Sequence, residues 1–232
     1  MKTLLKRFEL NNFYRLTNND IKTASEVYAR AYSKITLYEK ALEDIEDKTL
    51  VLKTFFEIPI RFGIKYGFAY APTEQLEGIS IWIPCEKADM TMWRMIRSGG
   101  FKNIFKLAKI GRKFLASLQE LSQLDKDRHK NMVGKRYLHL MSIAVDPEYQ
   151  RKGVGSKLLN AMFEKTDICE YYVYVSADID NVDFYKNHGF KTIKELNVKV
   201  NNYDLPNWEM VRNPNNINLT KFYKRKKIVE IS

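Results

Sequence analysis

The chain has 232 residues, of which 45% are hydrophobic, and its formal net charge is +11 at neutral pH. This length and composition predict one globular unit with its own core, because no repeat or linker divides the sequence. Two cysteines are too few for a disulfide framework or a metal cluster. No apolar run is long enough for a signal peptide or a membrane span. We therefore expect a soluble, cytoplasmic, metal-free protein, either a monomer or a homodimer.

The first third of the chain is predicted to contain a strand, two helices and a hairpin. Polar residues at 18–20 offer N-cap side chains for the first helix. The second helix has a strongly apolar face, and Pro59 is expected to kink or break it. The expected ranges are 8–17 for the strand, 21–32 and 45–65 for the helices, and 68–70 and 79–83 for the hairpin.

A helical insertion is expected over about 86–134, and Ser98-Gly99-Gly100 should divide it. Apolar residues recur there at helical spacing, and a basic face lies opposite them. Such a stretch either covers the sheet with its apolar face or lies on a membrane surface. We favour the first interpretation, with the basic face solvated. The basic residues are Arg94, Arg97, Lys102, Lys106, Lys109, Arg112 and Lys113.

The clearest chemical signal runs from Tyr137 to Ser156. An apolar run over 138–145 has the length of a buried strand and ends at Asp146-Pro147. A turn with two glycines then leads into a helical stretch. A strand, a glycine-containing turn and a helix N-terminus together favour an anion such as a phosphate, because free N–H groups point at it. The spacing matches neither a Walker loop nor a dinucleotide-binding fingerprint.

A second motif follows an expected strand over 171–176. It reads N-x-x-x-F-Y-x-x-x-G-F from Asn181 to Phe190, and Gly189 suits a left-handed helix C-cap. Further strands are expected over 191–196 and 208–212.

The segment Gln150-x-x-Gly-x-Gly after Val-Asp-Pro, together with this second motif, resembles the GCN5-related N-acetyltransferases. The resemblance is tight over 137–212 and loose before it. It implies an α/β (α+β) fold, with a mixed, largely antiparallel sheet and helices on both faces. We expect a single domain over 1–232, including the insertion and a basic tail over about 213–232. The final strands resemble small-molecule members such as the puromycin type.

The resemblance implies acetyl-CoA as the cofactor. Backbone N–H groups of the central strand would polarise the acetyl carbonyl, with Val145 the best candidate. Asn181 would contact CoA, or it caps the helix. Tyr185 would protonate the CoA thiolate, or it only packs, while Phe184 is expected in the core. The expected cofactor-binding residues are Ile143, Ala144, Val145, Gln150, Arg151, Lys152, Gly153, Val154, Gly155, Ser156, Asn181 and Tyr185.

The general base is not evident from the sequence. His139 on the central strand is one candidate, since an imidazole suits proton transfer near neutral pH. Glu57, Glu86, Ser142 and a water chain are weaker ones. A carboxylate is expected near the incoming amine, but none can be singled out. His188 is interpreted as a surface residue and His129 is expected in a charged loop, and neither suggests metal binding. The resemblance implies Trp93, Met95 and Phe101 as acceptor contacts.

We therefore expect an N-acetyltransferase that moves an acetyl group from acetyl-CoA to a primary amine of a small molecule by direct attack. The alternatives are a peptide or protein amine acetyltransferase, and a CoA-binding sensor that transfers nothing. The stretch Lys221–Lys227 interleaves aromatic and basic residues, as nucleic-acid-binding segments do. No nucleic-acid-binding signature accompanies it, and positive charge also attracts an anionic cofactor. We expect no nucleic-acid partner.

Overall fold

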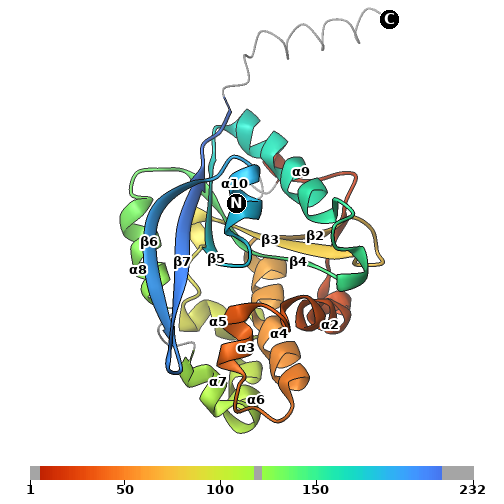
Figure 1. Ribbon diagram of the computed structural model, residues 1–232. Helices are drawn as coiled ribbons and strands as arrows, with labels where there is room; N and C mark the ends of the chain where they lie inside the picture. Colours follow the sequence, from red (N-terminus) through yellow and green to blue (C-terminus); the bar gives the residue numbers. More distant parts are fainter. Residues whose placement is uncertain (1–5, 118–121, 216–232) are drawn as a thin grey trace, which may run out of the picture.

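A seven-stranded sheet forms the centre of the protein (Figure 1). The computed structural model describes residues 6–117 and 122–215, so the basic stretch Lys221–Lys227 lies outside them. The strands are β1 (Tyr14–Arg15), β2 (Phe68–Ala71), β3 (Gly78–Pro84), β4 (Tyr137–Val145), β5 (Tyr172–Asp178), β6 (Lys191–Val200) and β7 (Tyr203–Arg212). Their order is β1-β2-β3-β4-β5-β7-β6, and every pairing is antiparallel except that of β4 with β5. The predicted mixed, largely antiparallel sheet is confirmed.

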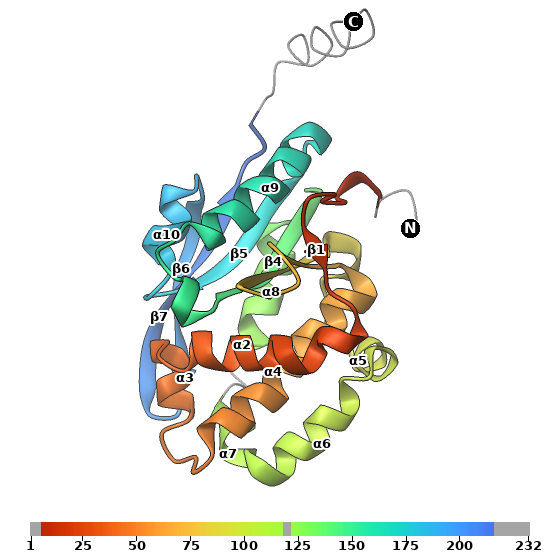
Figure 2. The same cartoon turned by 90° about the vertical axis from the view of Figure 1, so that its right-hand side faces the viewer.

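Helices cover both faces of this sheet, as expected (Figures 1 and 2). On one face lie α2 (Ile21–Tyr32) and α4 (Lys48–Tyr66), and on the other lie α9 (Val154–Cys169) and α10 (Val182–Asn187). The short helix α3 (Thr36–Ala41), which was not predicted, follows α2. No helix in the described part of the chain is long and apolar enough to span a bilayer.

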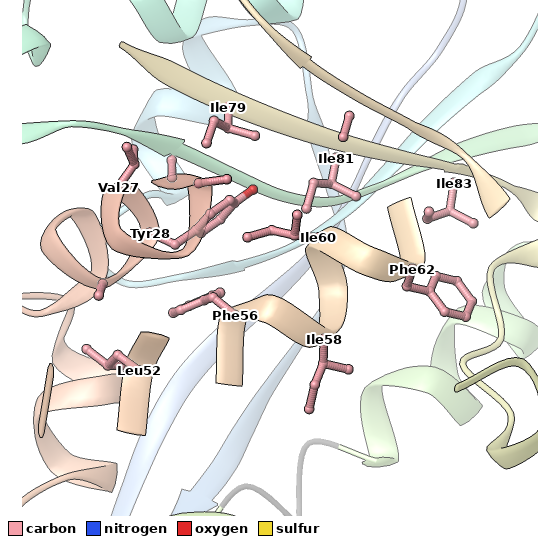
Figure 3. Packing of buried hydrophobic residues seen from close by; sticks show 14 of the residues in the cluster. Val27, Tyr28, Leu52, Phe56, Ile58, Ile60, Phe62, Ile79, Ile81 and Ile83 are labelled. Atoms are coloured by element: carbon pink, nitrogen blue, oxygen red, sulfur yellow. The ribbon is translucent and has the colours of Figure 1, made fainter. Parts of the chain in front are cut away.

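Strand β3 is buried on both faces because both helical layers pack against it. Ile79, Ile81 and Ile83 point toward α2 and α4, where they join a core cluster with Tyr28 and Phe56 (Figure 3). Alternate residues such as Trp82 belong to a second cluster under α9. Each fully buried isoleucine contributes roughly 1.5–3 kcal/mol to folding. The alternation along β3 thus holds the two helical layers to one sheet.

The insertion forms α5 (Met92–Ser98), α6 (Phe101–Ile110), α7 (Arg112–Ser117) and α8 (Ser122–Asn131). The predicted break at Ser98-Gly99-Gly100 is confirmed. The prediction that the apolar face of this insertion covers the sheet is wrong, because α5 and α6 pack on α4. Only part of the apolar set is buried there, for example Leu107 and Phe114. Others such as Met95 and Ile104 are partly buried, whereas Met92, Trp93, Ile96 and Phe105 are exposed.

Several element boundaries differ from the sequence predictions for local reasons. The first strand shortens to Tyr14–Arg15, because Leu10 leaves the ladder and donates its N–H to the Tyr70 hydroxyl. Helix α2 begins and ends as predicted, whereas α4 begins at Lys48, where the Asp47 side chain caps it. Helix α4 continues through Pro59. The last two strands are longer than expected and meet at a turn with Asn201 at φ +52°.

Candidate active site

Strands β4 and β5 separate partway along their length, and this separation creates the site. They pair only from Tyr137–Tyr172 to His139–Tyr174, although β4 continues to Val145. Met141 is an extra residue in β4, because the pairing with β3 shifts between Ile81–Ser142 and Trp82–Leu140. A bulge of this kind bends the strand that carries it. The second half of β4 therefore has an open edge facing away from β3.

The backbone groups on that open edge come from alternate residues. The Tyr32 hydroxyl donates to the carbonyl of Ile143 at 3.0 Å, and Gln150 Nε2 donates to that of Val145 at 3.1 Å. On the opposite edge, the N–H of Asp146 donates to the Glu77 carbonyl at 3.0 Å. Because successive residues of a strand point to opposite edges, the N–H groups of Ile143 and Val145 face the opening. The N–H of Ala144 faces β3, so only two of the three predicted amides are placed to contact a ligand.

A cavity of about 660 Å³ lies between the end of β4, the start of α9 and α10. It brings together every predicted cofactor-binding residue except Lys152 and Tyr185. The Lys152 ammonium lies over the ring of Tyr149 instead. Sequence reasoning missed the cavity's contributions from α2 and from the turn before α10. The lining residues are Ala31, Tyr32, Ile35, Ile143, Ala144, Val145, Tyr149, Gln150, Arg151, Gly153, Val154, Gly155, Ser156, Asp180, Asn181 and Phe184.

The N-terminus of α9 opens into this cavity and suits an anion. Gly153 caps the helix without a side-chain bond at φ +79°, so it covers none of the free N–H groups of the first turn. A Cβ at Gly153 would meet no protein atom within 4 Å, so the space before the helix is open. Arg151 also adopts a left-handed φ of +61°, a conformation found mostly at turns and binding sites. The residues present therefore fit a diphosphate group such as that of CoA.

One side chain of α10 and one of its C-cap help to shape this phosphate-binding site, which we call the cradle. A Cβ at Gly155 would lie 3.2 Å from Phe184 Cζ, so the glycine lets that ring approach the helix. Phe184 lines the cavity and is also packed, half-buried, against the second core cluster. His188 accepts or donates a hydrogen bond at 2.9 Å from Ser156 Oγ, and its Nδ1 lies 2.7 Å from the Phe184 carbonyl. The interpretation of His188 as a plain surface residue is therefore wrong.

A second cavity, of about 300 Å³, meets the first at Tyr32, Ile143 and Asn181. It is mainly apolar and aromatic. Asp178 supplies its only carboxylate among the described residues, and no lysine, arginine or histidine of the described chain lines it. The lining residues are Tyr32, Leu37, Tyr38, Phe55, Phe56, Ile58, Pro59, Met90, Leu124, Leu140, Met141, Ser142, Ile143, Val175, Ser176, Ala177, Asp178, Asn181, Tyr185 and Asn207.

One protein-family model matches part of the chain. Residues 109–192, which span the end of α6 to the start of β6, match the model of the acetyltransferase (GNAT) domain. Over these residues the chain is similar to a GNAT acetyltransferase domain. The recognition from the two sequence motifs is thereby confirmed, and so is the enzyme class, an acetyltransferase. No curated protein sequence matches the chain.

Solved structures agree with this assignment at the level of the fold. One is described as histone acetyltransferase HPA2 and related acetyltransferase, from Corynebacterium glutamicum, with 15% identity and a TM-score of 0.59. The match covers 88% of this chain and 96% of that one. Another is an agmatine N-acetyltransferase, with 12% identity, a TM-score of 0.54, and coverage of 87% and 98%. At these identities the likeness shows the fold alone, and it does not single out the puromycin type.

Asp178, at the end of β5, lines the second cavity, and sequence reasoning did not single it out. Its Oδ1 accepts hydrogen bonds from Asn181 Nδ2 at 2.8 Å and from the Asp180 N–H at 3.1 Å. Burial is the main cause that raises the pKa of this carboxyl above its usual value. Asn181 occupies the N-cap position of α10, but its side chain makes no cap bond. Its amide instead bonds Asp178, and Asn181 itself lines both cavities.

Tyr185 lies on α10 with its side chain buried against the second cavity rather than the first. Burial raises the pKa of its phenol well above 10, and the nearby Tyr32 and Asp178 raise it further. The hydroxyl is therefore protonated at neutral pH and has a proton to donate. Its role as the general acid stays a prediction.

The structure does not bring His139 to either cavity. Its ring packs edge-on against Tyr174, and its Nδ1 lies 3.3 Å from Arg128 Nη1. Burial, followed by the charge of Arg128, lowers its pKa well below 6.5. The role of His139 as the base stays a prediction that this placement does not favour.

Among the weaker base candidates, only Ser142 lines the second cavity, where its hydroxyl is bonded to that of Tyr28 at 2.8 Å. Glu57 instead bonds Arg61 and Asn103, and Glu86 lines neither cavity.

The insertion does contribute to the second cavity, but through residues that were not predicted. Met90 and Leu124 line it, whereas Trp93, Met95 and Phe101 do not. The Arg128 guanidinium, almost fully buried, bonds Asp89 at 2.8 Å and Asp125 at 2.6 Å. The contact with Asp89 joins the segment before α5 to α8, whereas the contact with Asp125 lies within α8. The expected substrate contacts of Trp93, Met95 and Phe101 are therefore wrong.

Proposed function

We propose that the protein transfers an acetyl group from acetyl-CoA to the primary amine of a small, largely apolar molecule. One observation carries the proposal: the two cavities meet at the open edge of β4, and the half-buried carboxylate of Asp178 lines the second cavity. A cavity of about 300 Å³ lies at the lower end of the range of small-molecule sites. Its aromatic lining favours an apolar body, and Asp178 offers a partner for one ammonium group.

The charges of the second cavity narrow the class of acceptor. An amino acid would bring a carboxylate, for which the described lining holds no cationic partner. A polyamine would bring a second ammonium into an apolar wall, where an unpaired charge is costly. A monoamine on an aliphatic or aromatic body meets neither obstacle. We infer this class ahead of a peptide or protein amine.

The chain's own residues suit the steps of such a reaction. Asp178 can hold the ammonium and, because its pKa is raised, can accept a proton from it. The N–H groups of Ile143 and Val145 face the opening and can stabilise negative charge on a carbonyl oxygen. Tyr185, protonated in its buried position, can donate a proton to a leaving thiolate. Acetyl-CoA, when bound, supplies the activated acetyl group.

The test combines binding with turnover. Acetyl-CoA should raise the melting temperature of the purified protein, and ATP should not. Thiol release should then be faster with arylalkyl and alkyl monoamines than with polyamines, amino acids or a peptide with a free N-terminus. A CoA-dependent shift without thiol release from any amine would favour a sensor, and faster acetylation of the peptide would favour the peptide alternative.

The variant Asp178→Asn isolates the carboxylate. A charge-assisted hydrogen bond contributes about 1.5–3 kcal/mol, so kcat/KM for the amine should fall roughly 10- to 150-fold. Acetyl-CoA binding should be retained. Asp183→Asn is the matched control, because Asp183 is a nearby exposed carboxylate on α10. Equal kcat/KM in the two variants would remove Asp178 from amine recognition. The cytoplasmic location, the single-domain organisation and the oligomeric state stay predictions.

A further inference from the structure

The outer surface of α5 and α6 exposes large apolar side chains. Trp93 is 66% exposed, Met92 and Phe105 are each 59% exposed, and Ile96 is 41% exposed. These four account for half of the large apolar side chains exposed in the described chain. Helices α5 and α6 lie at the rim of the molecule, remote from α9 (Figures 1 and 2). We call this surface the α5–α6 face.

The same face carries a concentrated positive charge. Residues 90–117 contain seven basic residues and no acidic one. Among the described residues, no carboxylate lies within ion-pair distance of the exposed Arg97, Lys102, Lys106, Lys109 or Arg112. In α6, Lys102, Phe105, Lys106 and Lys109 follow the spacing i, i+3, i+4, i+7. They form one stripe in which an aromatic ring is set among lysines.

The orientation of α6 is determined by its inner side. Asn103 is buried and donates through Nδ2 to the Thr54 carbonyl at 3.1 Å and to Glu57 Oε2 at 3.0 Å. Leu107 is fully buried on the same side. The helix thus turns an asparagine inward and a phenylalanine outward. This arrangement leaves the apolar ring of Phe105 in water, which is unfavourable in free energy. A partner that covers the ring would remove this unfavourable contribution.

We propose that the α5–α6 face docks on an anionic lipid surface. Tryptophan and phenylalanine enter the headgroup boundary readily, and lysine and arginine extend their charged ends to anionic headgroups. A second copy of the protein is disfavoured as the partner, because the positive charges of the two α5–α6 faces would repel each other. A nucleic acid would pair with the lysines but would leave aliphatic Met92 and Ile96 without a partner. The proposal is independent of the acetyl-transfer chemistry.

The experiment is co-sedimentation of the full chain with vesicles. One set contains equal parts of phosphatidylglycerol and phosphatidylcholine, and the other contains phosphatidylcholine alone. We expect binding to the anionic vesicles only. Each basic residue near an anionic surface contributes about fivefold to partitioning, so Lys106→Ala with Lys109→Ala should weaken binding roughly 25-fold. Lys126→Ala with Lys130→Ala on α8 is the charge-matched control and should bind nearly as the wild type.

The apolar contribution is tested separately. Trp93→Ala and Phe105→Ala should each weaken binding to anionic vesicles, whereas Ile168→Ala, an exposed apolar residue on α9, should not. Trp82 is buried and Trp208 is half-buried, so a blue shift of tryptophan emission on adding vesicles would report Trp93. A loss of binding on charge removal with no effect of Trp93→Ala or Phe105→Ala would overturn the proposal. If the protein self-associates without lipid and Trp93→Ala abolishes this association, the proposal would be overturned in favour of a second copy. If the protein binds duplex DNA more tightly than anionic vesicles, it would be overturned in favour of a nucleic acid.

Discussion

A negative charge placed at the start of α9 should expel the cofactor without unfolding the protein. Gly153 is the N-cap of that helix at φ +79°, and open space surrounds the position of its missing Cβ. Gly153→Asp and Gly153→Asn have nearly the same shape, and both residue types tolerate left-handed backbone. The two variants therefore differ mainly by one charge, which would lie where the helix N-terminus favours an anion.

The size of the effect follows from the exposure of the cradle. Two unit charges 4 Å apart repel by about 1 kcal/mol in bulk water and about 4 kcal/mol near a protein surface. For a site at the mouth of a cavity we take about 2 kcal/mol, so Gly153→Asp should bind acetyl-CoA roughly 30-fold more weakly than Gly153→Asn. Raising the salt concentration should narrow the difference, because salt screens exposed charges.

Isothermal titration calorimetry with acetyl-CoA measures this difference directly. Gly134→Asp is the matched control, since Gly134 has φ +73° and equally open surroundings but lies outside both cavities. Both aspartate variants should lose about 1–2 kcal/mol of stability from the left-handed backbone, and only the one at Gly153 should lose affinity. Equal affinity of the Asp and Asn variants at Gly153 would show that no anion binds at this helix end, and the cradle would then be misassigned.

Three further outcomes follow from buried groups. Asp167→Ala should destabilise the protein by about 3–5 kcal/mol in urea unfolding, because Arg212, bonded to both carboxylate oxygens, would be left buried and unpaired; a loss below about 1 kcal/mol would contradict this. Tyr185→Phe should slow turnover by about 100-fold or more while acetyl-CoA affinity stays within a few-fold, and unchanged turnover across a pH series would remove Tyr185 from the mechanism. The folded-state pKa of His139 lies well below 6.5, so the unfolded state binds its proton first and stability should fall as the pH drops below about 6.5. His139→Gln should make that fall shallower, and an unaltered pH dependence would show that His139 does not contribute to it.

The order of elements and the cofactor loop could be predicted from the sequence because both depend on neighbouring residues. An apolar run, a stop at Asp146-Pro147 and two glycines before a helix are local features. The free N–H groups of a helix N-terminus exist whatever the rest of the chain does. For the same reason helix α2 was predicted with its observed bounds, and Gly189 has the positive φ expected of a C-cap.

Residues that act through distant neighbours could not be predicted in this way. His139 was one candidate for the general base, but its ring lies against Arg128 from the insertion and lines neither cavity. The face of α6 was expected against the sheet, but buried bonds from Asn103 to α4 set its rotation. Each of these outcomes depends on a partner far away in the chain, and no periodicity within a helix or strand encodes such a partner.

The sequence by itself therefore determined the strand–turn–helix that can hold a phosphate, together with the family motifs around it. Only the tertiary structure formed the cavity that we propose for the acceptor. The bulge at Met141 arises from the pairing of β4 with β3, and the cavity beside it needs walls from α2, α4 and the insertion. Asp178 gains its raised pKa from burial among these elements, because desolvation exists only after they have packed together.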